Sequence, residues 1–521
     1  MTKNQNPLFS YLEKEHIAID KSEFIFQFQS HPDFPSLLAI SDTLHFFSVE
    51  NGALAVEFSE IDLLPDRFIA ILKENTLSQS FYIERREERF FYTSGNKPVE
   101  ISKTELETRW QGIILLVEKS DVVVEKPVQK ANSILYTVLI LAFLVGLFVM
   151  KADFQSKLFI VFPLIGLLFS IATLKDLLGT KSKLLNDFCN ITASTSCTSV
   201  IGSEKWKLFK YINFSDLSTV FFATQFAGTF LFLFSGNAEH FYFIQQVLLL
   251  GSIPVIFISL YFQKFVEKKW CPICLAIMVV IIAEIIYLRV TMPGSAVSIT
   301  SMAVFAFLFL FISAVWSAFK KNLLKLKELK EFQFRANRFI RNYEIFKNIL
   351  VSNQKNELAH SPIILGNRDS STEIAIITNP FCGYCKEAHE ILDEILHRYH
   401  DKIKIKILIN ADFDNIGENE KKVYRSLMSI YLDKGERAFL EALSNWFSNP
   451  NLEEWLKNHN YRIFDTEKID AFYSVQHQWC IENNAFHTPS LYINGYRYPK
   501  SYDRNNLKYF VDEIIEDANF N

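Results

Sequence analysis

Six apolar runs follow one another in the middle of the chain. They cover about residues 133–150, 158–174, 216–235, 241–262, 274–290 and 298–319. Each is close to the ~20 residues that a helix needs to cross a bilayer. A globular core can bury one such run, but so many in so short a stretch exceed what a domain of ordinary size can hide. The pattern therefore predicts a multidomain membrane protein with an all-α transmembrane helix bundle over residues 130–320.

The segment before the apolar runs has the pattern of a soluble α+β domain. Ser36–Phe47 has a helical period, and the runs that alternate like strands are Ser80–Glu84, Arg89–Thr93 and Gly112–Glu118. The N-terminal 30 residues lack a basic start followed by an apolar run, so they do not predict a cleavable signal peptide. Residues 1–125 are expected to form a separate domain.

A charged segment and a second soluble domain follow the apolar runs. Residues 321–358 carry apolar positions every three or four residues, which predicts an amphipathic helical connector. Residues 359–521 then alternate, with strands at Thr372–Thr378, Ile403–Asn410 and Ser490–Asn494 and helices at Lys386–Tyr399 and Asn505–Asp517. A mostly helical insertion occupies about residues 417–470. This order predicts an α/β domain.

Composition agrees with membrane spans joined to soluble parts. Hydrophobic residues make up 49% of the 521 residues and charged residues 21%, and the mean hydropathy is +0.11. The net charge of -4 and the pI of about 6.3 give no reason to expect a nucleic-acid partner.

The seven cysteines are grouped in a way that points to redox or metal chemistry. None precedes residue 189, and six of them form one C-x7-C and two C-x-x-C pairs, at Cys189/Cys197, Cys271/Cys274 and Cys382/Cys385. The C-x-x-C spacing is typical of redox or metal sites. Cys480 has no spaced partner, and we expect it to be a buried packing residue.

The last pair lies in the sequence NPFCGYC at residues 379–385, between a predicted strand and a predicted helix. The free N–H groups and dipole of the helix N-terminus favour a thiolate, so Cys382 is the predicted nucleophile. Cys385, one turn further, is placed to resolve a mixed disulfide on Cys382. A zinc half-site completed by Cys480 and His487 is the structural alternative.

This pair, together with FHTPSLYING at residues 486–495, resembles the thioredoxin superfamily. The resemblance covers about residues 360–521 and implies a thioredoxin-like fold. It also implies that Pro489 is cis, and that Thr488 offers backbone contacts to a bound substrate.

The pair Cys271/Cys274 opens an apolar span, so its thiols are predicted at the membrane boundary. A quinone, which is a two-electron oxidant dissolved in the bilayer, can be reached by a dithiol in that position. Cys274 is deeper in the span and is expected to face the quinone. A four-thiolate zinc site with Cys189 and Cys197 is the alternative.

Loop cysteines ahead of one span, and C-x-x-C at the start of a later one, resemble the vitamin K epoxide reductase family and its bacterial members fused to thioredoxin-like domains. Residues 155–295 carry the resemblance, including CTSVIGS at 197–203. It implies that Cys189 exchanges with Cys382, that Cys197 passes electrons to Cys271, and that Cys274 reduces menaquinone or ubiquinone. No metal is expected in this relay.

Residues 1–125 resemble the papain-like cysteine peptidase domain of bacteriocin-exporting ABC transporters, through HPDFPSLLAI at 31–40 and RWQGII at 109–114. A peptidase of that family needs a cysteine and a histidine base, but no cysteine precedes Cys189, and SQSF at 78–81 stands where the histidine is expected. We therefore expect a degenerate peptidase-like domain that recruits a polypeptide or has a structural role.

These features predict a quinone-dependent thiol oxidase of the bacterial inner membrane that introduces disulfides into cysteine-containing exported polypeptides. With six spans, the soluble domains and all the cysteine pairs lie on one face. Oxidising chemistry predicts the periplasmic face, whereas the lysines that flank the cysteine side of the spans predict a cytoplasmic one. Two alternative functions are a peptide-export or assembly factor with structural thiols, and a reductase that passes electrons outward.

Overall fold

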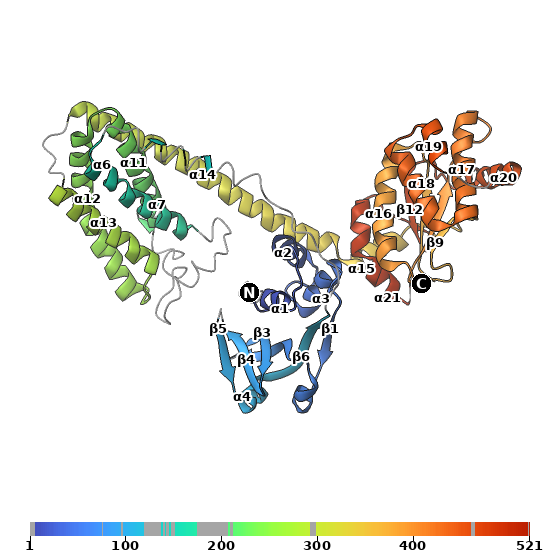
Figure 1. Cartoon of the computed structure of the whole chain (residues 1–521), viewed down its shortest axis with the longest axis horizontal. Helices are drawn as coiled ribbons and strands as arrows, with labels where there is room; N and C mark the ends of the chain where they lie inside the picture. The colour runs from blue at the N-terminus through green and yellow to red at the C-terminus, as the bar shows by residue number, and fades with distance from the viewer. Residues whose placement is uncertain are drawn as a thin grey trace. The chain divides into compact units, whose positions relative to one another are not determined.

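The structure is a computed structural model, and it describes residues 6–74, 77–94, 97–118, 152–174, 207–208, 212–291, 298–459, 464–518 and a few isolated positions. The chain divides into two compact units. One comprises residues 1–125 and 333–521, and the other comprises residues 126–332. Figure 1 shows the elements of each.

The N-terminal domain consists of three helices followed by an antiparallel sheet. The helices are α1 (Asn6–Lys14), α2 (Lys21–Ser30) and α3 (Leu37–Phe46), and a shorter α4 (Lys103–Arg109) precedes the last strand. The strands are β1 (Asn51–Ala55), β2 (Arg67–Glu74), β3 (Leu77–Arg86), β4 (Arg89–Ser94), β5 (Lys97–Ile101) and β6 (Trp110–Val117), in the sheet order β1-β6-β2-β3-β4-β5. The predicted helix and the three predicted strands are confirmed as α3, β3, β4 and β6.

Alternation along β2 explains why this sheet has apolar clusters on both faces. Ile69 packs in a cluster with the helices, whereas its neighbours Phe68 and Ala70 pack in a second cluster with Phe81. Successive strand residues point to opposite faces, so a strand that is apolar at consecutive positions is buried on both sides. In Figure 1 the helices α1–α3 lie along one side of the sheet.

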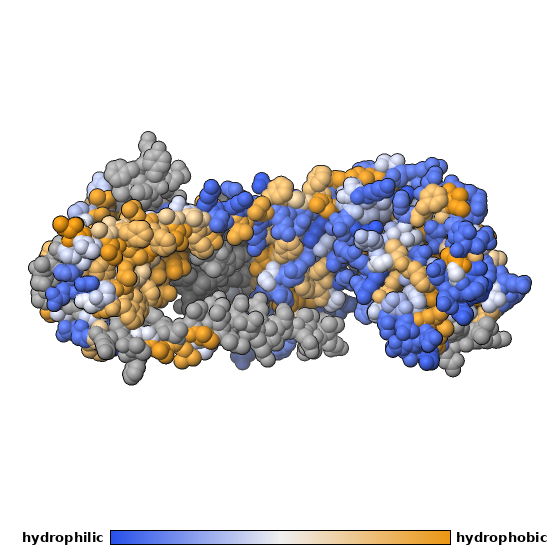
Figure 2. Space-filling model, turned by 90° about the horizontal axis from the view of Figure 1, so that it is seen from above, coloured by the Kyte–Doolittle hydropathy of each residue, from blue (hydrophilic) through white to orange (hydrophobic). Residues whose placement is uncertain are grey.

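The second unit contains five helices that are long and apolar enough to cross a membrane. They are α6 (Phe154–Phe159) with α7 (Val161–Thr173), α11 (Phe214–Phe234), α12 (Ala238–Tyr261) with its π-helical end η4 (Phe262–Val266), α13 (Pro272–Thr291) and α14 (Ile299–Ile340). Five of the six predicted spans are thus confirmed, and the one predicted at 133–150 lies outside the described residues. Figure 2 shows hydrophobic residues over the visible face of the bundle.

Helix α14 does not end where the predicted connector begins. It continues through the charged residues to Ile340, and α15 (Tyr343–Val351) follows after a short break capped by Asn342. The charged segment is therefore helical as predicted, but it is continuous with the last span rather than a separate element.

The C-terminal domain is built on a five-stranded mixed sheet. The strands β9 (Ile364–Gly366), β10 (Glu373–Thr378), β11 (Lys404–Ile409), β12 (Ser490–Ile493) and β13 (Tyr496–Arg497) are ordered β13-β12-β10-β11-β9. Only β10 and β11 pair in parallel, and α16 (Gly383–Tyr399) connects them. A parallel pair with a crossover helix, extended by an antiparallel hairpin, is the arrangement expected of a thioredoxin-like domain.

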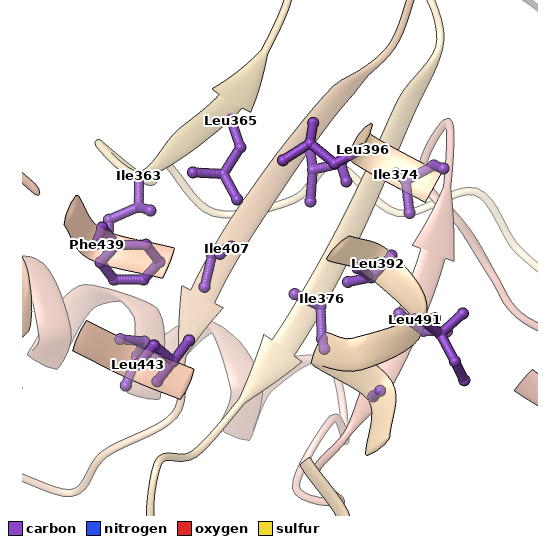
Figure 3. Close-up of a cluster of buried hydrophobic side chains, with 14 of the residues drawn as sticks. Ile363, Leu365, Ile374, Ile376, Leu392, Leu396, Ile407, Phe439, Leu443 and Leu491 are labelled. Carbon is purple, nitrogen blue, oxygen red and sulfur yellow. The ribbon is translucent and has the colours of Figure 1, made fainter. Parts of the chain in front are cut away.

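The insertion forms the helices α17 (Glu418–Lys434), α18 (Glu436–Ser448), α19 (Leu452–Asn458) and α20 (Thr466–Glu482). It contributes to the main core, because Phe439 and Leu443 of α18 join Ile407 and Leu392 in one buried cluster (Figure 3). The insertion is therefore an integral part of the domain.

The helix predicted at Asn505–Asp517 is present, but as two shorter helical elements rather than one. The segment divides at Phe510 into the 3₁₀ helix η5 (Arg504–Tyr509) and α21 (Val511–Glu516). The Phe510 ring is fully buried and stacks on Phe346 of α15, with the ring centroids 4.1 Å apart. Packing of this ring determines where the segment bends, and the local sequence pattern does not contain that information.

Candidate functional site

The cysteines of the thioredoxin-like domain lie where β10 gives way to α16. Cys382 is the N-cap of the helix, with φ -95° and ψ 116°, and Cys385 lies in its first turn. Cys385 is buried and Cys382 is partly exposed, and the pair is in the dithiol state. A partner molecule can therefore reach Cys382 first, as the predicted roles require.

The surroundings of the two thiols separate their pKa values. Burial alone would raise the pKa of Cys382, but hydrogen bonds from the Thr488 and Cys385 side chains and from the backbone amides of Tyr384 and Cys385 outweigh it and lower the pKa. Burial raises the pKa of Cys385 to about 11. Cys382 is thus the better thiolate, because its charge is partly solvated and receives donors at the helix N-terminus.

The predicted Thr-Pro loop lies beside this pair. The Thr488–Pro489 peptide bond is cis, as expected. The Cys382 thiol donates to the Thr488 carbonyl, with 3.4 Å between sulfur and oxygen. A guanidinium nitrogen of Arg504 lies 3.4 Å from the Pro489 carbonyl, to which it donates. The structure therefore brings together four of the predicted site residues.

The insertion holds the cysteine loop in place, which the sequence did not reveal. The indole Nε1 of Trp446 in α18 donates to the Pro380 carbonyl at 3.0 Å. The Tyr424 hydroxyl of α17 donates to Asn379 Oδ1 at 3.0 Å, and the same oxygen accepts from the Phe381 amide at 2.8 Å. These contacts fix the residues immediately before Cys382.

Aromatic side chains close in sequence to the reactive thiol and its loop are exposed. Tyr384 is 76% exposed, Phe486 51% and Phe381 44%. Large aromatic side chains on a surface are characteristic of places where other proteins bind.

Cys480 lies apart from the dithiol, in a cluster with Ala359, Ile377, Leu408 and Tyr492. It is fully buried, and burial raises its pKa to about 11, which fits the expected packing role. Within the part of the chain that the structure describes, no group of three or more His, Cys, Asp or Glu residues is arranged to hold a metal ion.

The bundle dithiol lies at the N-terminal end of α13. Cys271 is fully buried, and its Sγ accepts a hydrogen bond from the Cys274 amide at 3.2 Å. Gln263, in the π-helical end of α12, is also buried and accepts from the Cys271 amide through Oε1 at 2.8 Å. This contact ties the end of one span to the start of the next and fixes the position of the pair.

Cys274 lines an apolar cavity of about 700 Å³ within the bundle. Phe222, Ile277 and Phe305 are among the residues in its wall, and Thr173 and Ser259 supply some of the few polar groups. The volume lies in the range of sites for small organic ligands, and such sites are mostly apolar. The sequence predicted a dithiol at the membrane boundary but not this cavity beside it.

Cys189 and Cys197, the predicted loop pair, lie outside the described residues. Their exchange with Cys382 and Cys271 stays a prediction.

A surface dithiol on a thioredoxin-like fold and a second dithiol in a membrane bundle define a membrane-bound thiol–disulfide oxidoreductase. In sequence comparison, a model of the vitamin K epoxide reductase family matches residues 157–289. This range contains Cys189, Cys197, Cys271 and Cys274. It does not include residues 1–125, so the peptidase resemblance of the N-terminal domain stays a prediction.

Several solved structures resemble part of the chain. Oxidised BdbD from Bacillus subtilis is 13% identical over 31% of this chain and 99% of its own, with a TM-score of 0.25. The thiol–disulfide exchange protein α-DsbA2 from Wolbachia pipientis is 19% identical over 33% and 92%, with a TM-score of 0.25. The catalytic domain of Proteus mirabilis ScsC is 20% identical over 33% and 99%, also at 0.25. No curated protein sequence matched.

Proposed function

We propose that the protein is a quinone-dependent thiol oxidase that introduces disulfides into exported polypeptides. The observation that carries the proposal is the position of Cys274 in the wall of an apolar cavity, at the head of a membrane-spanning helix. A quinone in that cavity is a two-electron acceptor. Oxidation of the Cys271/Cys274 dithiol releases two electrons and two protons, which convert the quinone to a quinol, so the step balances without another reactant.

Cys382 is the group that meets the polypeptide substrate. In the oxidised domain, a substrate thiolate attacks Cys382, the Cys382–Cys385 bond breaks, and the sulfur of Cys385 leaves. A second substrate thiolate then displaces Cys382, which yields the substrate disulfide and the reduced domain. The exposed aromatic residues Phe381, Tyr384 and Phe486 and the backbone of Thr488 provide a surface for an unfolded cysteine-containing segment.

Cys189 and Cys197 are the proposed shuttle between the two dithiols. Cys189 oxidises Cys382, and Cys197 passes the electrons to Cys271. Chain connectivity is compatible with this route, because α11 and α12 separate Cys197 from Cys271, and α13 and α14 separate Cys271 from the thioredoxin-like domain. Two crossings in each interval return the chain to the same side of the membrane.

We place this side on the periplasmic face of a bacterial inner membrane, because reduced cytosolic thiols would dissipate the oxidation. A reporter fused after Asn521 tests this choice. Activity of a periplasm-specific reporter is expected, and activity of a cytoplasm-specific reporter would instead support the orientation that the lysines predict.

Quinone absorbance provides the test of the function. Purified protein in detergent receives a reduced cysteine peptide and a soluble quinone, and the variants are Cys274→Ser, Cys382→Ser and, as a control outside the dithiols, Cys480→Ala. We expect quinone reduction in the wild type and the control and none in the other two. Absence of reduction by the wild type, or persistence in Cys274→Ser, would contradict the proposal and favour an export factor or an outward reductase.

A further inference from the structure

A series of buried side chains begins at the Cys385 thiol and leads away from the exposed surface of the site. Thr378, the last residue of β10, forms a side-chain hydrogen bond with Cys385. The Thr378 hydroxyl oxygen also lies 3.0 Å from Nε2 of His389. His389 is four residues beyond Cys385 in α16, so the two side chains share one face of the helix. All three residues are buried.

His389 also lines a small cavity. The cavity holds about 20 Å³, which is room for one water molecule. Its charged groups all come from α16, namely Lys386, Glu390 and Asp393, whereas α18 supplies only uncharged side chains, which include Ser444 and Phe447. Among the described residues, Thr378 is the polar group that faces His389 from β10.

Dithiol exchange requires a proton to move at Cys385. When a thiolate attacks Cys382 in the oxidised pair, the S–S bond breaks and Cys385 leaves with the electron pair. A negative charge on a buried sulfur is costly, so Cys385 must take up a proton. When the disulfide forms again, Cys385 must lose that proton before it attacks.

We propose that Thr378 and His389 carry this proton between Cys385 and the cavity beside Asp393. As Cys385 leaves, it takes the hydroxyl proton of Thr378, which in turn takes the Nε2 proton of His389. In the same concerted step Nδ1 of His389 accepts a proton from the cavity, so the imidazole stays neutral. The reverse sequence removes the proton when Cys385 attacks, and no proton is gained or lost within the chain of groups.

The protonation states of these groups suit a relay. Burial lowers the pKa of His389 to about 4, so at pH 7 its ring is neutral and has one nitrogen that accepts and one that donates. Burial, together with Glu390, raises the pKa of Asp393 to about 6, so this carboxyl exchanges protons readily near neutral pH. The inference deepens the proposed function, but it rests on the dithiol exchange and not on the quinone step.

A chromogenic aromatic disulfide separates the two chemical steps. The full-length protein is used in detergent with the other five cysteines replaced, so that only Cys382 and Cys385 react. Attack by Cys382 releases a first coloured thiolate, and attack by Cys385 on the mixed disulfide releases a second. Both rates are followed by stopped-flow absorbance between pH 5 and pH 9 for the wild type, Thr378→Val and His389→Phe.

We expect both variants to slow the second release at pH 7 by about 100-fold, which is typical of a lost acid–base group, and to leave the first release unchanged. Their second step should rise with hydroxide concentration, whereas the wild-type rate should depend less on pH. Thr378→Ser keeps the hydroxyl and should restore the wild-type profile. Thr372→Val, the same change at another buried threonine, should alter neither step.

A second release that matches the wild type at every pH in both variants would overturn the relay. Equal slowing of both releases would also overturn it, because that outcome indicates a displaced cysteine loop. Quinone takes no part in this assay, so its outcome is independent of the quinone-reduction experiment.

Discussion

Trp446 offers the sharpest test of how the helical insertion controls the reactive cysteine. Its indole is buried, donates to the Pro380 carbonyl at 3.0 Å, and packs edge-on against Phe381 with 5.3 Å between ring centroids. Trp446→Phe keeps an aromatic ring and removes the donor. The Pro380 carbonyl then lacks this donor, and the free energy of unfolding should fall by about 1–3 kcal/mol.

Buried Cys480 provides the readout of stability for the domain, because its thiol is labelled only when the domain opens. Pulsed labelling in urea, resolved by mass spectrometry, measures the opening equilibrium at this one cysteine. We expect Trp446→Phe to raise the opening constant by about 5- to 150-fold, since 1.36 kcal/mol corresponds to a factor of ten. We also expect faster exchange of the backbone amide protons of Phe381 and Cys382.

Trp455→Phe is the matched control. Trp455 is equally buried and donates through Nε1 to the Ala442 carbonyl at 2.8 Å, but this bond lies within the insertion. A similar loss of stability is therefore expected, without faster exchange in the cysteine loop and without a change in Cys382 alkylation. If the two variants affect the loop equally, the Trp446–Pro380 bond does not hold the reactive cysteine, and the reasoning fails.

Four further predictions concern the dithiols. Alkylation by iodoacetamide should have its pH midpoint below the ordinary pKa of a thiol for Cys382, and near pH 11 for Cys385. Urea titrations of the reduced domain at several pH values should show two opposite effects. The stability contributed by Cys382 is fully present above its unfolded pKa and is lost as the pH falls through its folded pKa. The stability contributed by Cys385 is lost as the pH rises through about 11. A membrane-permeant maleimide should label Cys274 before the fully buried Cys271, and a soluble quinone should slow that labelling; equal rates would place the cavity elsewhere. Gln263→Leu removes the acceptor for the Cys271 amide. The free energy of opening this site should fall by about 1–3 kcal/mol, so Cys271 should react faster with the same reagent. Unchanged reactivity would contradict the role of this bond.

Sequence patterns predicted the features that depend on local chemistry. The five described spans follow from apolar length, and the helix-terminal position of Cys382 and the cis bond at Pro489 follow from short motifs beside a strand. Each of these signals lies within a few neighbouring residues, so a single sequence contains it.

The supporting contacts could not be predicted in the same way. Trp446 and Pro380 are 66 residues apart in the sequence. A tryptophan in an amphipathic helix is expected to be an ordinary core residue, so the pattern does not indicate this contact. The sequence likewise gives His389 only as a polar residue of α16, and its contact with the Thr378 hydroxyl is visible only in the structure. The cavity beside Cys274 is formed by several helices at once, and its shape depends on their packing, which the length and composition of each span do not specify.

The bundle and the thioredoxin-like domain are parts of one polypeptide, and helix α14 lies between them in the sequence. This helix is uninterrupted over residues 299–340. In the proposed relay, the electron donor and its acceptor therefore belong to the same molecule, so they meet at an effective concentration that does not depend on the enzyme concentration. Turnover per molecule should then be independent of enzyme dilution. By the same reasoning, a mixture of Cys382→Ser and Cys274→Ser molecules should recover little activity, because each lacks one half of its own circuit.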